Sequence, residues 1–249
     1  DASMIENALA KQREKAAAHF VATPVEPVLD TRPEDETRYR DEGSSQVQSI
    51  NLARLHRMGV VAPDAEKSQI AEEFRIIKRP LIANAFGQGA ARVRNGNLIM
   101  VTSSLPGEGK SFCAINLAIS MAMEMDRTVL LVDADVAKPR VPEYLGIHAD
   151  KGLLDVLMTR LVEDIGNRYP DRIILFDSPP LLATSESSVL ATHMGQIVMV
   201  VEAEKTSQEA VREALSHIQS CEVVGMLLNK TTPTPGADYY YGYYGSYGK

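Results

Sequence analysis

Five short apolar runs divide the second half of the chain, and each is bounded by charged residues or glycine. They cover residues 98–102, 128–132, 172–176, 196–201 and 223–228. Near-continuous Val, Ile, Leu and Met are typical of strands that helices cover on both faces. The pattern therefore predicts a mostly parallel sheet in a doubly wound α/β domain, with its core over about residues 90–230.

Segments with helical spacing lie between these runs. Residues 110–125 are apolar almost all round, which predicts a buried helix after the first run. A capping box at Thr206 and Glu209 predicts the start of a later helix. The apolar face of that helix carries Val211, Ala214, Leu215 and Ile218.

The ends of the chain differ from this core. Residues 1–49 read as an amphipathic helix over 5–20 and a charged, proline-containing linker. Residues 50–230 form the main domain, and we expect Pro80 to disturb a helix near its start. That helix carries an apolar stripe of Ile70, Phe74, Ile77 and Leu81. Residues 231–249, rich in Pro, Gly and Tyr, predict a flexible tail.

Charge and cysteine content limit which partners and which cellular compartment we expect for the protein. Asp and Glu number 33 against 26 Lys and Arg, so the formal net charge is −7 and nucleic acid is not an expected partner. No apolar run approaches the ~18 residues of a membrane span, and the N-terminus lacks the apolar core of a secretory signal. Cys113 and Cys221 lack metal-ligand or redox spacing. We therefore expect buried thiols in a cytoplasmic protein.

A glycine-rich loop directly follows the first predicted strand. Residues 103–111 read Ser-Ser-Leu-Pro-Gly-Glu-Gly-Lys-Ser, a P-loop with Ser104 in place of the usual first glycine. Backbone N–H groups of such a loop converge on phosphate oxygens, and the following helix adds its positive end. Lys110 would reach the outer phosphates, and the Ser111 hydroxyl would ligate Mg²⁺. The residues expected to bind the nucleotide here are Ser104, Pro106, Gly107, Glu108, Gly109, Lys110, Ser111 and Phe112.

Polar residues end three of the other predicted strands. Asp133 and Asp135 follow the second run, Asp177 follows the third, and Asn229 ends the last. Ligands of open parallel sheets lie beyond the carboxyl ends of the strands, so the carboxylates favour Mg²⁺–nucleotide chemistry. The alternative is that an Asp in such a place caps a turn or helix. The Asn229 amide would read the nucleotide base.

Six of the nine tyrosines lie in the last eleven residues: Tyr239, Tyr240, Tyr241, Tyr243, Tyr244 and Tyr247. A tyrosine hydroxyl has a pKa of ~10, so it needs an oriented carboxylate and a metal-neutralised γ-phosphate to react near neutral pH. The nineteen tail residues have a root-mean-square reach of roughly 25 Å. That reach permits attack within one chain or on a neighbour.

The P-loop, the two strand-end motifs and the tyrosine-rich tail together resemble the bacterial tyrosine kinases (BY-kinases) over about residues 68–249. The chain is most similar to the stand-alone autokinases associated with exopolysaccharide synthesis, including the exosortase-associated type. The resemblance implies an ATP-dependent autokinase with a fold like that of the partitioning ATPases. It also implies that Lys110 and Ser111 bind ATP and Mg²⁺, that Asp133 accepts or orients the tyrosine proton, and that Asp135 and Asp177 hold the metal.

The resemblance further implies partners. The family's Glu-x-x-Arg-x-x-Arg oligomerisation motif occurs as Glu72, Arg75 and Lys78, which implies a ring whose subunits phosphorylate one another's tails. The alternative is a solvated helix face, on which such pairs contribute only ~0.2–0.5 kcal/mol. A transmembrane polysaccharide co-polymerase would serve as adaptor, placing the chain at the inner face of the plasma membrane.

The chain departs from the family pattern at two sites. The arginine that usually follows the second Asp of the D-x-D motif by two residues is Ala137, with Lys138 and Arg140 close by. Between Arg160 and Leu161 the family has roughly forty to fifty further residues. Either this protein is shortened there or the sequence lacks a segment. The flanking matches at residues 152–157 and 168–171 favour the second explanation.

Two other functions fit parts of the sequence. A partitioning-type switch ATPase would use the same P-loop, although Leu105 stands where those relatives carry a second lysine. It would also leave the tyrosine cluster without a role. A non-catalytic, nucleotide-gated scaffold is compatible with Ala137 and with the missing segment.

Overall fold

The structure is a computed structural model of the 249-residue chain. It describes residues 48–63, 68–87, 93–124, 128–147, 162, 164–166 and 168–232. The predicted helix at 5–20, the linker as far as residue 47 and the tyrosines of the tail lie outside these residues.

Five parallel strands form one sheet in the order β2-β3-β1-β4-β5. Each predicted apolar run is a strand whose ends differ by at most one residue from the prediction. The sheet is therefore the predicted parallel one, and its order reverses at β1. The strands are β1 (Leu98–Ser103), β2 (Val129–Asp133), β3 (Ile173–Asp177), β4 (Gln196–Glu202) and β5 (Val223–Asn229).

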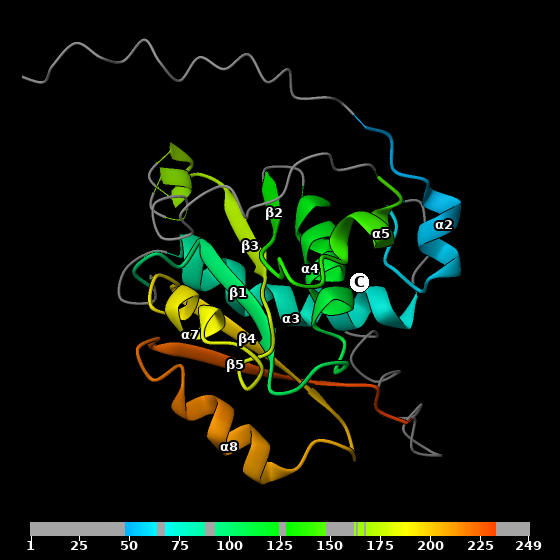
Figure 1. Ribbon diagram of the computed structural model, residues 1–249. Coiled ribbons are helices and arrows are strands. Elements are labelled where there is room, and N and C mark those ends of the chain that lie inside the picture. Colours follow the sequence, from blue (N-terminus) through cyan, green and yellow to red (C-terminus); the bar gives the residue numbers. More distant parts are fainter. Residues whose placement is uncertain are drawn as a thin grey trace, which may run out of the picture. The chain divides into compact units, whose positions relative to one another are not determined.

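Helices cover both faces of the sheet, which confirms the doubly wound fold class (Figure 1). On one face α3 (Gln69–Phe86) and α4 (Lys110–Ala122) pack against alternate strand residues such as Ile99 and Leu175. On the other face α7 (Glu186–Ala191) and α8 (Gln208–Ser216) pack against Met100 and Phe176. Ten residues of α4 are buried, as its apolar composition predicts.

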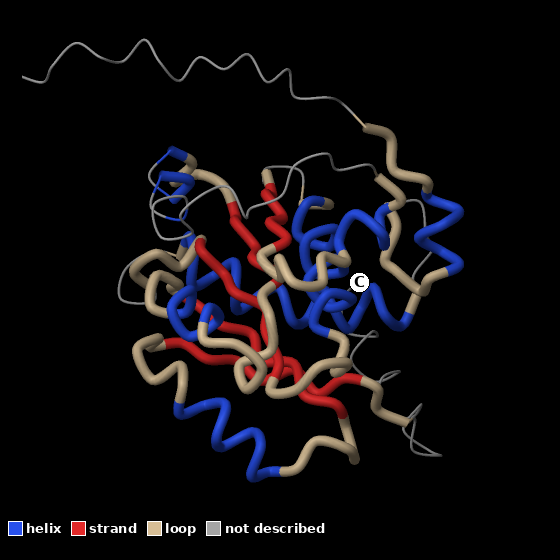
Figure 2. Tube along the Cα trace, viewed as in Figure 1, coloured by secondary structure: helices blue, strands red, loops and turns tan. Residues whose placement is uncertain are grey.

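Two further short helices, α2 (Leu52–Arg57) and α5 (Val141–Leu145), lie beside α4 (Figure 2). They close a smaller apolar cluster against it. Sequence periodicity did not predict α2, α5 or α7, because five or six residues make fewer than two turns. Among the described residues, no helix has both the length and the apolar content needed to cross a bilayer.

Helix α3 runs through Pro80, contrary to the expected disturbance, and continues to Phe86. Proline removes the hydrogen bond to the carbonyl four residues earlier, here that of Ile76. Both Ile76 and Pro80 lie on the exposed face of the helix, where solvent can hydrogen-bond the Ile76 carbonyl.

The capping box predicted at Thr206 is also wrong. The N-cap of α8 is Ser207, whose hydroxyl accepts a hydrogen bond from the N–H of Ala210 at 3.2 Å. The Thr206 hydroxyl instead donates to the Glu108 carboxylate of the P-loop. The edge strand β5 differs from the prediction too, because Met226 and Leu228 are 59% and 62% exposed rather than covered.

Gln196, the first residue of β4, joins α3 to the sheet through a fully buried amide. Its Nε2 donates to the carbonyls of Leu81 at 3.0 Å and Gly96 at 2.6 Å. Its Oε1 accepts from Asn84 Nδ2 at 2.8 Å. The amide therefore satisfies polar groups that the apolar core would otherwise leave unpaired.

We expect Gln196→Leu to lower the free energy of unfolding by about 2–3 kcal/mol, because two carbonyls and one amide group in the core lose their hydrogen-bond partner. Urea unfolding of the full chain measures this change. Gln208→Leu on the exposed face of α8 is the matched control, and its effect should stay within about 0.5 kcal/mol. Equal effects of the two variants would show that the Gln196 network does not stabilise the fold.

Candidate nucleotide site

The carboxyl ends of the five strands bring the predicted site residues to one edge of the sheet. β1 leads into the P-loop at the point where the strand order reverses, and its neighbour β3 ends in Asp177. β2, next to β3, ends in Asp133, and Asp135 follows two residues later. This is the crevice in which open α/β sheets bind ligands.

The P-loop has the backbone of an anion site. Gly107 and Gly109 have φ angles of 90° and 97°, a region that favours glycine. Helix α4 begins at Lys110, and its N-cap, Gly109, offers no side-chain hydrogen bond. The first N–H groups of the helix are thus free of a side-chain cap and can receive phosphate oxygens.

The ammonium group of Lys110 lies between two carboxylates. Its Nζ is 2.7 Å from Asp135 Oδ2 and 3.7 Å from Asp177 Oδ1, and the Ser111 hydroxyl is 3.5 Å away. Lys110 and Asp135 are only 8% and 6% exposed. A buried charge needs a partner, and this pair satisfies both charges. The structure therefore brings Lys110, Ser111, Asp135 and Asp177 together, as predicted.

Asp177 has no exposed surface, and neither of its side-chain oxygens accepts a hydrogen bond. Burial raises the pKa of this carboxyl to about 6, which the nearby charge of Lys110 and the Ser111 hydroxyl only partly offset. A buried carboxylate with unused oxygens fits a hard cation.

Asp135 and Ser111 would complete the protein's share of a Mg²⁺ site with Asp177. Within the described part of the chain no three acidic, His or Cys side chains gather as a metal cluster. Mg²⁺ at nucleotide sites usually binds one or two carboxylates together with phosphate and water oxygens, which these three residues would allow.

Asp133 has a different environment. Its carboxylate accepts the backbone N–H groups of Asp135 at 3.2 Å and of Arg140 and Val141 at 2.9 Å. Partial burial raises the pKa of Asp133, and these N–H groups oppose the rise. The carboxylate thus fixes the turn that leads into α5, as in the capping alternative. Its role as proton acceptor stays a prediction.

A cavity of about 320 Å³ lies at the P-loop. Seven predicted residues line it: Pro106, Gly107, Gly109, Lys110, Ser111, Phe112 and Asp135. Sequence reasoning did not assign the opposite wall to the site, although the Asp177-Ser-Pro-Pro motif and the basic residues after Asp135 were indications of it. That wall consists of Ala137, Lys138, Arg140, Tyr144, Pro179, Pro180, Ala183 and Thr184.

Three residues predicted to bind the nucleotide, Ser104, Glu108 and Asn229, do not line this cavity. Ser104 is fully buried, and its carbonyl accepts the N–H of Leu182 at 3.2 Å. The Asn229 amide donates to the carbonyl of Glu108 at 2.9 Å. In this structure the Asn229 amide therefore contacts the protein's own loop, and base recognition by Asn229 stays a prediction.

The predicted oligomerisation motif is divided between the surface and the interior. Arg75 and Glu72 form an exposed pair at 2.6 Å. Lys78 is only 6% exposed, and its Nζ donates to the carbonyl of Ser120 at 2.5 Å and pairs with Glu124 at 2.7 Å. Ser120 lies in the last turn of α4, so Lys78 satisfies a helix-end carbonyl there. In this structure the Lys78 ammonium group therefore contacts α4, and a role for Lys78 between subunits stays a prediction.

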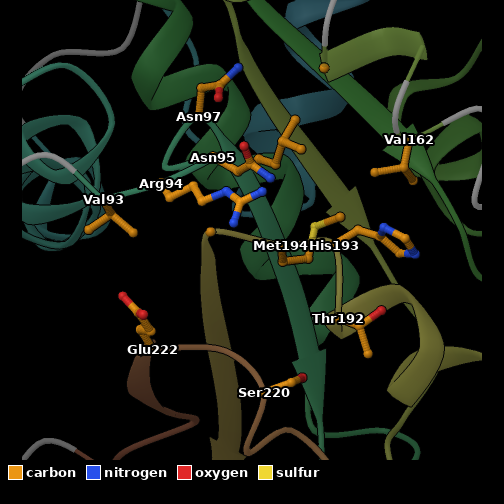
Figure 3. Close-up of a pocket in the computed structure, with 13 residues that line it drawn as sticks. Val93, Arg94, Asn95, Asn97, Val162, Thr192, His193, Met194, Ser220 and Glu222 are labelled. Atoms are coloured by element: carbon orange, nitrogen blue, oxygen red, sulfur yellow. The ribbon is translucent and has the colours of Figure 1, made fainter. Parts of the chain in front are cut away.

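A second cavity, of about 520 Å³, lies beside the amino ends of β1 and β4 (Figure 3). The P-loop follows the carboxyl end of β1, at the opposite edge of the sheet. None of the predicted site residues lines it. Its charged groups include Arg94 and Glu222, which are of opposite sign and both exposed. The charges that line this cavity therefore indicate neither an anionic nor a cationic ligand.

Comparisons with known proteins agree with this geometry. A family model of the ParA type, described as NUBPL iron-transfer P-loop NTPase, matches residues 94–160. The chain is 30% identical over 200 residues to a putative tyrosine-protein kinase, EpsB of Ralstonia nicotianae, which covers 65% of this chain and 26% of EpsB. It is 27% identical over 232 residues to the tyrosine-protein kinase YwqD of Bacillus subtilis, covering 78% of this chain and 94% of YwqD.

Another relative is the succinoglycan biosynthesis transport protein ExoP of Rhizobium meliloti, 26% identical over 244 residues, with 78% of this chain and 30% of ExoP covered. The chain thus spans about a quarter of the length of EpsB and under a third of ExoP. The kinase domain of Escherichia coli tyrosine kinase ETK superposes with a TM-score of 0.57 at 17% identity, over 77% of this chain and 84% of that chain. This likeness shows a shared fold.

The alignments also bear on the expected internal gap. The match to EpsB extends over 200 positions but covers 65% of 249 residues, or about 162, which leaves about 38 positions without a counterpart here. The match to YwqD leaves a similar shortfall, 232 positions against 78% of 249, or about 194. Both figures fit either a shortened protein or a sequence that lacks a segment, and the predicted position near residues 160–161 lies outside the described residues.

We expect Asp177→Asn to stabilise the protein in metal-free buffer. Because the pKa of Asp177 in the folded chain, about 6, lies above the ordinary value of 3.8, the folded state binds this proton more tightly. Its contribution to stability is complete below pH ~4 and is lost as the pH rises through about 6. The variant should exceed the wild type by about 2–3 kcal/mol at pH 7.5 and by about half as much at pH 5.

Chemical unfolding at several pH values in EDTA measures this difference. Asp171→Asn, on the exposed turn before β3, is the matched control and should show no such pH-dependent gain. A gain for Asp177→Asn that is the same at pH 5 and pH 7.5 would contradict the assignment.

The two roles within the oligomerisation motif are separable by substitution. Lys78→Met should lower the free energy of unfolding by about 1–2 kcal/mol, because a helix-end carbonyl loses its charged donor. Arg75→Met should change it by less than about 0.5 kcal/mol, because its pair is exposed. Urea unfolding tests both variants, and sedimentation tests whether Arg75→Met alone impairs self-association. Loss of stability in Arg75→Met, with none in Lys78→Met, would reverse the assignment.

Proposed function

Because this chain is a homologue of the bacterial tyrosine-protein kinases, we propose that it transfers the γ-phosphoryl group of ATP to tyrosines of its own C-terminal segment. The observation that carries this proposal is the buried Lys110, held between Asp135 and Asp177 at the P-loop. A cation held at the P-loop supports contact with the outer phosphates of a bound nucleotide.

Each group of the site would have a defined task. The P-loop N–H groups and the start of α4 would bind the phosphate oxygens, and Lys110 would contact the γ-phosphate. Asp135, Asp177 and Ser111 would hold Mg²⁺, which neutralises charge on the transferred group when bound. Lys138 and Arg140 line the same cavity and add positive charge to its outer wall.

In the reaction, the tyrosine oxygen would form a bond to the γ-phosphorus while the bond from that phosphorus to the β–γ bridging oxygen breaks. ADP leaves, and the phenolic proton passes to a carboxylate, for which Asp133 is the predicted acceptor. The candidate acceptors are Tyr239, Tyr240, Tyr241, Tyr243, Tyr244 and Tyr247.

We further propose that the transfer occurs between subunits of an oligomer assembled through the exposed pair Glu72–Arg75. A membrane-spanning polysaccharide co-polymerase would act as adaptor and hold this chain at the inner face of the plasma membrane. A relative named for succinoglycan biosynthesis and transport supports a role in controlling exopolysaccharide production.

Incubation of the full chain with γ-labelled ATP and Mg²⁺ should label its C-terminal peptide. Lys110→Met should lower this labelling by roughly a hundredfold, because the P-loop loses its γ-phosphate contact. Peptide mapping locates the label. A variant with all six tail tyrosines changed to Phe is the matched acceptor control. It should lose the label on the tail while its nucleotide affinity stays unchanged.

Mixing these two variants tests transfer between subunits. The Lys110→Met chain has an intact tail and the tail variant has an intact P-loop, so labelling of the Lys110→Met chain requires a second chain. Absence of label in the mixture, with wild type labelled, would restrict transfer to one chain. Phosphate release without labelled protein would favour a switch ATPase, which the ParA-type match also fits. If neither labelled protein nor released phosphate is found, the result would favour a non-catalytic scaffold.

A further inference from the structure

The exit of β5 contacts the outer side of the P-loop through two side-chain hydrogen bonds. Asn229 Nδ2 donates to the carbonyl of Glu108 at 2.9 Å, and Lys230 Nζ donates to the carbonyl of Gly107 at 2.7 Å. The partners are more than 120 residues apart in the chain. Both bonds involve consecutive peptide groups of the loop, and neither donor lines the nucleotide cavity.

These contacts set the direction of the loop's N–H groups. In a planar trans peptide the carbonyl and the following N–H point in opposite directions. Holding the carbonyls of Gly107 and Glu108 on the outer side therefore directs the N–H groups of Glu108 and Gly109 to the inner side. The inner side is the cavity, where converging N–H groups bind phosphate.

Gly109 is required for this close approach. A Cβ atom at this position would lie 2.1 Å from Asn229 Nδ2, a distance at which the Asn229 side chain must move. The glycine of the P-loop thus serves two purposes, the φ of 97° and the space for the Asn229 amide.

The carboxylate of Glu108 also anchors the P-loop through its hydrogen bonds. It is 2% exposed and accepts the N–H of Leu105 at 2.6 Å, the N–H of Glu202 at 3.3 Å and the hydroxyl of Thr206. The loop is therefore tied to the ends of both β4 and β5, which pair side by side through Glu202 and Asn229.

Lys230 is kept in place by Glu202. Its Nζ is 3.1 Å from Glu202 Oε2, and Lys205 also pairs with Glu202, at 3.2 Å. The hydrogen bond from Lys230 is the main cause that lowers the pKa of the Glu202 carboxyl. The carboxylate thus holds the ammonium group against the loop, whereas Lys205, 73% exposed, has no contact with the P-loop among the described residues.

We propose that Asn229 and Lys230 are positioning residues that latch the P-loop in its phosphate-binding conformation, so that the start of the C-terminal segment sets the affinity for the phosphate chain. This inference rests on the proposed nucleotide site. It assigns Asn229 to the loop backbone, where sequence reasoning had assigned it to the base.

The test compares Mg²⁺–ADP with Mg²⁺–tripolyphosphate, which has phosphates and no base, by calorimetric titration of the full chain. Lys230→Met and Asn229→Ala should each weaken binding of both probes by roughly fivefold to tenfold. Lys230→Arg should bind within about twofold of the wild type, because it retains the donor. Lys205→Met removes the same charge beside the same Glu202 and should also stay within about twofold.

Several results would overturn the latch. If Lys230→Met and Lys205→Met bound the probes with equal affinity, the effect of Lys230 would come from its charge alone and not from its hydrogen bond to the P-loop. If Asn229→Ala weakened the binding of ADP but not of tripolyphosphate, Asn229 would recognise the base instead. Failure of the wild type to bind either probe would remove the proposed nucleotide site and the latch together. Thermal unfolding without ligand verifies that each variant is folded, and Lys230, 47% exposed in its side chain, should tolerate the changes.

Discussion

The buried ammonium group of Lys110 is the charge on which the arrangement of the site depends. A cation at this depth is stable only with compensating carboxylates, and two strands supply them. Asp177 ends β3, Asp135 follows β2, and the start of α4 places Lys110 between them. The register of the parallel sheet therefore fixes the three charged groups relative to one another before any ligand binds. The same constraint leaves the oxygens of Asp177 without hydrogen bonds, which is costly for the empty protein.

The strands could be predicted to within one residue because buried parallel strands are uninterrupted apolar runs that end at charges. The P-loop and its acidic partners were predictable for a related reason, since each follows the end of a run. Exposure of Met226 and Leu228 was not predictable. An edge strand and a covered strand have similar composition, and only the fold shows that nothing in the described chain covers this part of β5.

The contacts that the local pattern did not predict share one cause, the choice between partners that are distant in sequence. Thr206 has the composition of an N-cap, yet its hydroxyl contacts Glu108, 98 residues away. Lys78 continues a surface motif at helical spacing, yet it bonds to Ser120 across the interface between α3 and α4. Asp133 has the position of a catalytic carboxylate and the hydrogen bonds of a cap. The local sequence pattern thus indicates that a polar residue is needed at a position, but tertiary packing decides which group forms its hydrogen bond.

Cys113 lies one turn into α4, the helix that begins at the P-loop. Burial raises the pKa of its thiol to about 12, so at neutral pH almost none of it is thiolate. A thiol reagent in solution can modify this sulfur only when the helix and its packing open. The rate at which such a reagent modifies Cys113 thus reports how often the helix that begins at the P-loop opens.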